Sequence, residues 1–186
     1  NRDASRLASR PDPRLSPELA GRIVGLSGRE RDRAIPCLRD SFVGVYRWHA
    51  KRTLRDVERV RAVSDARGDI VAVAMTELLV PEAGYVYYIA VSQKERRQGF
   101  AGLLLDEAMD DFRERGARVV YAAVVAENEP SRRLFRSRGF REVDRREPGY
   151  REGGLGAWGL RSRMRIVWGE VLLGVELRSL SRPPQA

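Results

Sequence analysis

The feature that most constrains this chain is a glycine-containing turn at residues 96–102 (RRQGFAG), which joins an apolar run to an amphipathic segment. The apolar run, residues 85–91, has the length of a buried strand, and the segment that follows from Leu103 has helical spacing. Glycine and small side chains let such a turn fold tightly with its outer face uncovered. Its amides then point toward one site, where the helix dipole favours an anion. The sequence therefore predicts a strand–turn–helix unit that binds a pyrophosphate-like group.

Two better-known phosphate-binding motifs do not occur in the sequence. There is no Gly-x-x-x-x-Gly-Lys-Ser/Thr loop, and no Gly-x-Gly-x-x-Gly with an acidic residue after the next strand. A glycine between a strand and a helix can also be a plain turn without a ligand. The segments around the turn decide between these interpretations.

A second block of residues follows the turn along the chain. Residues 119–126 are apolar enough for a buried strand, and Asn128, Pro130 and Gly139 delimit a short helix after it. Asn128 can cap this helix, Pro130 suits its first turn because a missing N–H costs nothing there, and Gly139 can end it in a left-handed conformation.

The turn and this second block together resemble the GNAT superfamily of acyl-CoA-dependent N-acyltransferases. Arg96, Gly99 and Ala101 fit the family signature Arg/Gln-x-x-Gly-x-Gly/Ala, and the resemblance extends over residues 20–148. It implies that the strand before the turn holds the pantetheine arm of acetyl-CoA and that the turn amides hold its pyrophosphate. On this basis the cofactor-binding residues are expected to be Ile89, Ala90, Val91, Arg96, Arg97, Gln98, Gly99, Phe100, Ala101, Gly102, Asn128 and Ser131.

The order of apolar elements, together with this resemblance, predicts a mixed α/β (α+β) fold. The expected architecture is a GNAT-like, mostly antiparallel twisted sheet with one splayed parallel strand pair, flanked by helices. A strand–helix–strand unit around the turn requires that parallel pair. Strands are expected at residues 22–26, 69–80, 85–91, 119–126 and 140–144. Helices are expected from residue 29, with a break near Pro36, and over residues 51–63, 101–115 and 131–138.

The 186 residues are expected to form one domain with a single hydrophobic core. Residues 1–20 are rich in Arg, Pro and Ser and are expected to be a loose tail, followed by the acetyltransferase domain over residues 21–148. Residues 149–186 combine a glycine-rich loop with a Val- and Leu-rich stretch. That stretch is expected to form a strand pair, which either completes the sheet or forms an arm for a homodimer.

The net charge of +9 is carried almost wholly by arginine. The arginines are spread along the chain, often beside Asp or Glu, whereas nucleic-acid binding favours a concentrated basic patch. We therefore expect no nucleic-acid partner, although the positive field would attract the polyanion CoA.

The composition also limits where the protein is expected to reside and whether it is expected to bind a metal. No apolar stretch is long enough to span a bilayer, and no segment has the pattern of a signal peptide. The single cysteine, Cys37, suits a reducing compartment, and with one histidine, His49, the chain offers no set of soft ligands for a metal. A cytoplasmic protein without a metal cofactor or a membrane partner is expected.

The catalytic residues are less clearly marked than the cofactor turn. The resemblance implies a tyrosine directly after Leu134 that protonates the departing CoA thiolate, but this chain has Phe135 there, which cannot donate a proton. The residues considered for the base that accepts the proton of the amine are Glu77, Glu127, Tyr85, Tyr87, Tyr88 and His49.

Glu77 and Tyr88 are the catalytic residues that we select from these candidates. Glu77 lies among apolar residues on the strand next to the cofactor strand, where burial would raise its pKa; the alternative is a strand residue that faces solvent. Tyr87 and Tyr88 are expected to point to opposite faces of their strand, so that one of them lines the acceptor groove. The resemblance also implies that residues 46–49, between the first two helical segments, shape the acceptor pocket.

Two functions remain open at this point. The first is an N-acetyltransferase, in which a primary amine of a protein or small molecule attacks acetyl-CoA directly in a ternary complex. The second is a non-catalytic acyl-CoA-binding module that regulates a partner, because Phe135 replaces the usual acid and no base is obvious.

Overall fold

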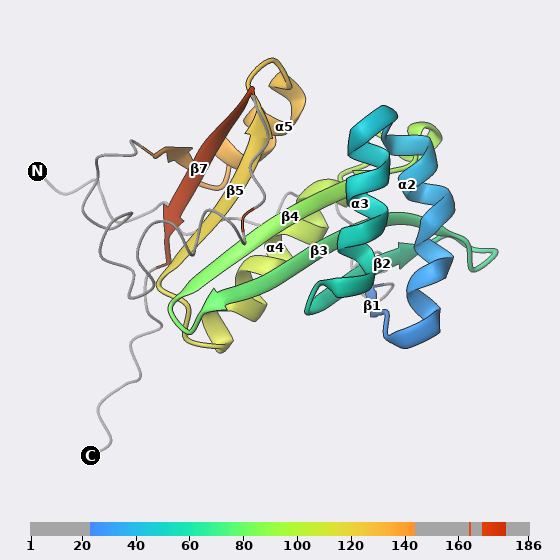
Figure 1. The fold of residues 1–186 in the computed structure, drawn as a ribbon, viewed down its shortest axis with the longest axis horizontal. Helices are drawn as coiled ribbons and strands as arrows, with labels where there is room; N and C mark the ends of the chain where they lie inside the picture. The colour runs from blue at the N-terminus through green and yellow to red at the C-terminus, as the bar shows by residue number, and fades with distance from the viewer. Residues whose placement is uncertain (1–22, 144–163, 165–168, 178–186) are drawn as a thin grey trace, which may run out of the picture.

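The computed structural model describes residues 23–143, 164 and 169–177, and its central feature is a mixed sheet (Figure 1). The described part contains seven strands in the order β1-β2-β3-β4-β5-β7-β6. All neighbouring strands are antiparallel except β4 and β5, which run parallel. The strands are β1 (Ile23–Gly25), β2 (Arg59–Ser64), β3 (Ile70–Val80), β4 (Ala83–Val91), β5 (Val119–Val125), β6 (Arg141–Glu142) and β7 (Glu170–Glu176). The predicted fold class is confirmed.

Helices cover both faces of the sheet. One face carries η1 (Gly28–Ala34), α2 (Ile35–Ser41) and α3 (Gly44–Asp56), which pack on β2, β3 and β4. The other face carries α4 (Phe100–Glu114) and α5 (Glu129–Arg136), and the short η2 (Gln93–Glu95) precedes α4. In Figure 1, α2 and α3 lie in front of the sheet and α4 lies behind it.

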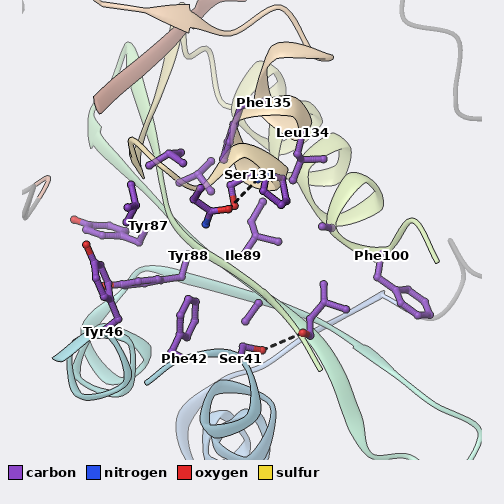
Figure 2. Close-up of a pocket in the computed structure, with 18 of the residues that line it drawn as sticks. Ser41, Phe42, Tyr46, Tyr87, Tyr88, Ile89, Phe100, Ser131, Leu134 and Phe135 are labelled. Atoms are coloured by element: carbon purple, nitrogen blue, oxygen red, sulfur yellow. Dashed lines mark hydrogen bonds between the residues drawn. The ribbon is translucent and has the colours of Figure 1, made fainter. Parts of the chain in front are cut away.

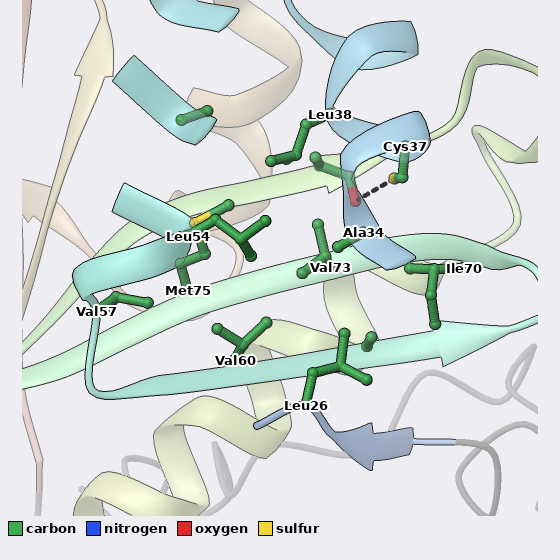
Figure 3. Close-up of a cluster of buried hydrophobic side chains, with 13 residues drawn as sticks. Leu26, Ala34, Cys37, Leu38, Leu54, Val57, Val60, Ile70, Val73 and Met75 are labelled. Carbon is green, nitrogen blue, oxygen red and sulfur yellow. Dashed lines mark hydrogen bonds between the residues drawn. The ribbon is translucent and has the colours of Figure 1, made fainter. Parts of the chain in front are cut away.

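A core of buried apolar side chains lies between the sheet and the helices α2 and α3 (Figure 3). Leu38 of α2 and Leu54 of α3 are fully buried against Val73 and Met75 of β3. The expected helix break occurs where η1 ends and α2 begins at Ile35, because the proline that follows suits the first turn of a helix. Apolar side chains from three helical segments therefore hold this end of the domain on the sheet.

Residues 51–63, expected to form one helix, form the end of α3 and the start of a strand instead. The helix ends at Asp56, and β2 begins at Arg59 and pairs antiparallel with β3. The residues from Arg59 to Ala62 alternate between half-buried and buried, which is the period of a strand rather than of a helix. The apolar positions at 57, 60 and 63 matched helical spacing, but the sheet supplies the better burial.

Two further differences concern element boundaries. Because α3 begins at Gly44, residues 46–49 lie inside this helix and not between two helical segments. Strand β6 covers only Arg141–Glu142, shorter than expected. From the C-terminal stretch, β7 lies between β5 and β6 and pairs antiparallel with both. The predicted tail at residues 1–20 and the glycine-rich loop within residues 149–163 lie outside the described residues.

Candidate active site

The candidate site lies where β4 and β5 part. These strands pair from Ala83 opposite Val119 to Val86 opposite Ala122, whereas β4 stays paired with β3 as far as Val91. Figure 1 shows the two strands diverging as a V. A cavity of about 860 Å³ occupies the gap and is bounded by β4, β5, the start of α4, α5 and the α2–α3 region (Figure 2). Within the described residues, no strand pairs with β4 on this side beyond Val86, so its backbone edge faces the cavity.

The turn before α4 forms one end of the cavity. Gly99 is the N-cap of α4 with a φ of 89°, and Arg97 has a φ of 65°, a left-handed conformation that is costly for a side chain other than glycine. Consecutive N–H groups in such a conformation converge and form a concavity that binds anions. The fifteen-residue helix α4 adds the positive end of its dipole. The geometry of this turn fits a pyrophosphate.

All of the residues predicted to bind the cofactor line this cavity except Gln98. The Gln98 amide donates a hydrogen bond to Glu95, a cavity residue, at 2.8 Å. The ring of Phe100 is buried in the core against Leu104, so this residue offers the cavity little more than its backbone. Asn128 accepts a hydrogen bond from the backbone N–H of Ser131 at 3.2 Å, which is the expected N-cap of α5.

Apolar and small polar groups line the middle of the cavity. Leu134 and Phe135 of α5 face Ile89 of β4, and Phe135 packs against Phe140 with its ring centroid 5.0 Å away. On the opposite wall, the Ser41 hydroxyl donates a hydrogen bond to the Val91 carbonyl at 3.1 Å. This part of the cavity suits a narrow and largely apolar arm.

Both Tyr87 and Tyr88 line the cavity, which corrects the expectation that only one would. Met75 of β3 pairs with Tyr88, and the next residue, Thr76, pairs with Val86. Tyr87 is therefore an extra residue on β4, and this bulge breaks the alternation of side chains that otherwise sends neighbours to opposite faces.

The two selected catalytic residues lie in different positions. Tyr88 lines the cavity, its hydroxyl lies 3.4 Å from Nδ1 of His49, and its ring packs edge-on against Phe42 at 5.3 Å. Glu77 does not line the cavity; its carboxylate accepts a hydrogen bond from the Tyr87 hydroxyl at 3.2 Å. The hydrogen bond to Tyr87 therefore links Glu77 to the cavity.

Burial and position decide the roles of Tyr85 and Glu127, the other base candidates, and of Cys37, which was not one of them. Tyr85 is buried and donates a hydrogen bond to the Met164 carbonyl at 2.9 Å, and burial raises the pKa of its hydroxyl far above the usual range. Glu127 is exposed and is not among the cavity residues. Burial also raises the pKa of the Cys37 thiol, whose Sγ lies 3.4 Å from the Val71 carbonyl. Tyr85 lines the cavity, but its raised pKa and its hydrogen bond to Met164 make it a poor base, and neither Glu127 nor Cys37 lines the cavity.

Sequence reasoning missed three charged cavity residues, Glu95, Arg138 and Glu170. Glu170 is brought in by β7, where it pairs with Val125, and no local pattern marks it. Tyr46 of α3 reaches toward Tyr87 (Figure 2). The pKa of Tyr46 is raised by burial and by the carboxylate of Glu170, which accepts its hydrogen bond. Arg138 follows α5, at the residue where that helix was expected to end.

These features define a class of protein: an α/β domain whose sheet opens at a parallel strand pair, with an anion-binding turn at the head of the next helix. A family model described as "Acetyltransferase (GNAT) family" matches residues 31–140, more than half of the chain. The chain belongs to the GNAT acetyltransferase family. Members of this family transfer an acyl group from acetyl-CoA.

Solved structures agree with this fold at low sequence identity. The ribosomal-protein-S18-alanine N-acetyltransferase from Escherichia coli has a TM-score of 0.62 and 21% identity, and the alignment covers 88% of this chain and 97% of the other. Ard1 from Thermoplasma volcanium has a TM-score of 0.63 at 14% identity, covering 84% and 97%. Tetrahymena GCN5 has a TM-score of 0.65 at 10% identity, covering 84% and 96%. No curated protein sequence matches the chain.

The described residues offer neither a metal-binding cluster nor a membrane-spanning helix. Among these residues, no cluster of three or more His, Cys, Asp or Glu side chains could hold a metal ion. None of the helices that the structure describes is both long and apolar enough to cross a membrane.

Proposed function

We propose that the chain is an N-acetyltransferase that binds acetyl-CoA between β4 and β5 and transfers its acetyl group to a primary amine in a ternary complex. One observation carries this proposal: a single cavity joins the anion-binding turn at Arg97 and Gly99 to an aromatic end at Tyr46, Tyr87 and Tyr88. A donor and an acceptor could thus meet in one cavity, and such positioning can supply much of the rate acceleration.

The donor half of the cavity is the turn and the open edge of β4. The N–H groups from Arg97 to Gly102 would hold the pyrophosphate, and the edge from Ile89 to Val91 would hold the pantetheine arm. Acetyl-CoA supplies an activated thioester when bound. A backbone N–H near Val91 would donate a hydrogen bond to the thioester oxygen and stabilise the negative charge that develops there.

The acceptor half is the aromatic end. An amine that arrives protonated must lose a proton before it attacks. That proton could leave by two routes. One passes through Tyr88, whose hydroxyl lies near Nδ1 of His49, and the other passes through Tyr87, which is hydrogen-bonded to Glu77. We favour Tyr88 as the group nearest the amine and Glu77 as the acceptor at the end of the second route.

Phe135 affects turnover because it occupies the position where family members carry the tyrosine that protonates the CoA thiolate. Phenylalanine has no hydroxyl to donate that proton. A thiol has a pKa of about 8.5, so its thiolate can leave near neutral pH without a donor. The same substitution favours the second candidate, an acyl-CoA-binding module without catalytic activity.

Calorimetry and a thiol-release assay test the two candidates together. Acetyl-CoA and CoA are titrated into the protein, and release of free thiol is followed with small amines, polyamines and peptides. The peptides include some with an N-terminal alanine, because one structural neighbour is a ribosomal-protein-alanine N-acetyltransferase. Thiol release with any amine supports the enzyme. Binding without release across the panel supports the regulatory module, and absence of binding rejects both.

A further inference from the structure

Arg138 lies directly over the first turn of α4, at Gly102. A Cβ atom added at Gly102 would fall 2.5 Å from Nη2 of Arg138, which is closer than such atoms approach in proteins. In the orientation that the guanidinium adopts here, position 102 has room only for a glycine. Both residues line the cavity, although 35 residues of chain separate them. This close approach brings a cation from the α5 side of the cavity to the head of α4.

The guanidinium of Arg138 is held in a fixed orientation. Its Nε and Nη2 donate hydrogen bonds to the two carboxylate oxygens of Asp106, each at 3.1 Å, and Nη1 donates to the Ser137 hydroxyl at 2.8 Å. A two-bond contact between a guanidinium and a carboxylate fixes both planes. An arginine carries five N–H donors, so the three bonds leave two for a ligand.

The charges at the head of α4 explain why the pairing of Arg138 with Asp106 matters for an anion. Asp106 lies in the second turn of α4, where its carboxylate would repel an anion bound at the helix N-terminus. The ion pair with Arg138 offsets that repulsion. Arg96 and Arg97 flank the same site from the turn, so Arg138 completes a set of cations on two sides of the anion-binding amides.

We propose that Arg138 binds a phosphate of the acyl-CoA cosubstrate, with Asp106 as its positioning residue and Gly102 as the residue that admits it. The phosphate belongs either to the pyrophosphate or to the 3′-phosphate of CoA, and both offer the same oxygens to a guanidinium. The inference rests on the proposed function only in that the cavity binds CoA; it requires no turnover.

Binding calorimetry with CoA and with dephospho-CoA, which lacks the 3′-phosphate, tests this role. Arg138→Gln removes the charge-assisted hydrogen bonds to the phosphate. It is therefore expected to weaken CoA binding about tenfold or more. Arg138→Lys keeps the positive charge but loses the planar, two-donor geometry of the guanidinium. Its affinity for CoA should therefore fall less than that of Arg138→Gln. The matched control is Arg133→Gln, an exposed arginine of α5 outside the cavity lining, which should stay within about twofold of the wild type because it changes only the general field.

The pattern of losses identifies the phosphate. An equal loss for CoA and dephospho-CoA assigns Arg138 to the pyrophosphate, and a loss for CoA alone assigns it to the 3′-phosphate. Gly102→Ala should fold, since alanine favours a helix, and should weaken CoA binding by displacing the guanidinium. Its effect should largely vanish in the Arg138→Gln background.

Two outcomes would overturn the assignment, and they are distinguishable. If Arg138→Gln is folded by circular dichroism and binds both ligands as the wild type does, Arg138 is no phosphate ligand. If the wild-type protein binds neither ligand, the proposed function itself fails, and this inference fails with it.

Discussion

The ring of Phe112 packs directly on the backbone of Gly84: a Cβ atom at position 84 would lie 2.7 Å from Cδ1 of that ring. Gly84 lies in the short stretch of β4 that pairs parallel with β5, opposite Val120, and Phe112 lies near the end of α4. This contact holds the C-terminal half of α4 against the sheet. It thereby fixes the helix axis whose N-terminus faces the cavity.

Gly84→Ala is therefore expected to destabilise the fold by about 1–3 kcal/mol, the usual cost of overpacking a filled core. The free energy of unfolding is measured in urea. Phe112→Leu in the same background should recover part of the loss, so that the two changes are not additive. An unchanged free energy for Gly84→Ala would contradict the close packing.

Gly99→Glu should weaken CoA binding by about 100-fold or more while the domain remains folded, because it puts bulk and negative charge into the anion-binding turn. Calorimetry with CoA measures the effect. Gly116→Glu is the matched control, since Gly116 ends α4 with a φ of 83°, close to the 89° of Gly99, and a side chain there meets only open space. Both variants carry similar backbone strain and the same charge. Equal affinities for CoA would refute the assignment of the turn.

Phe135→Ala should reduce stability by about 3 kcal/mol or more, because it removes a buried ring that packs against Phe140. Turnover per folded molecule should fall much less, since the ring donates no proton. Phe140→Ala serves as the control: Phe140 is equally buried but does not line the cavity. A large loss of turnover in Phe135→Ala alone, with folding and CoA affinity intact, would give Phe135 a catalytic role.

Tyr85 should make the fold sensitive to alkaline pH. Burial raises the pKa of its hydroxyl in the folded state, so the unfolded chain ionises first, above pH 10. This group's contribution to stability is therefore complete below pH 10 and decreases above it, by about 1.4 kcal/mol at pH 11.

Tyr85→Phe tests this pH dependence. At pH 8 it should cost about 1 kcal/mol, because the Met164 carbonyl loses its hydrogen bond. Between pH 8 and pH 11 the variant should lose less stability than the wild type. Urea unfolding at both values measures the difference, and parallel losses in the two proteins would show that Tyr85 does not titrate as described.

The sequence was most informative where local chemistry decides the structure. The turn from Arg96 to Gly102, the cap at Asn128 and the apolar strands before them depend on neighbours in the chain, and these elements formed where expected. The helix predicted over residues 51–63 failed because burial on the sheet, a non-local effect, determined the structure from Arg59 onward.

What the sequence determined by itself is therefore the glycine-containing turn and the order of strands and helices from β3 to α5, and through them the family. Only the tertiary structure decided which side chains share the cavity. Glu170 arrives through β7, Arg138 fits because Gly102 has no side chain, and the bulge at Tyr87 turns two neighbouring tyrosines to one site. Strand pairing and close packing join residues far apart in the chain, and neither leaves a periodic signal in the sequence.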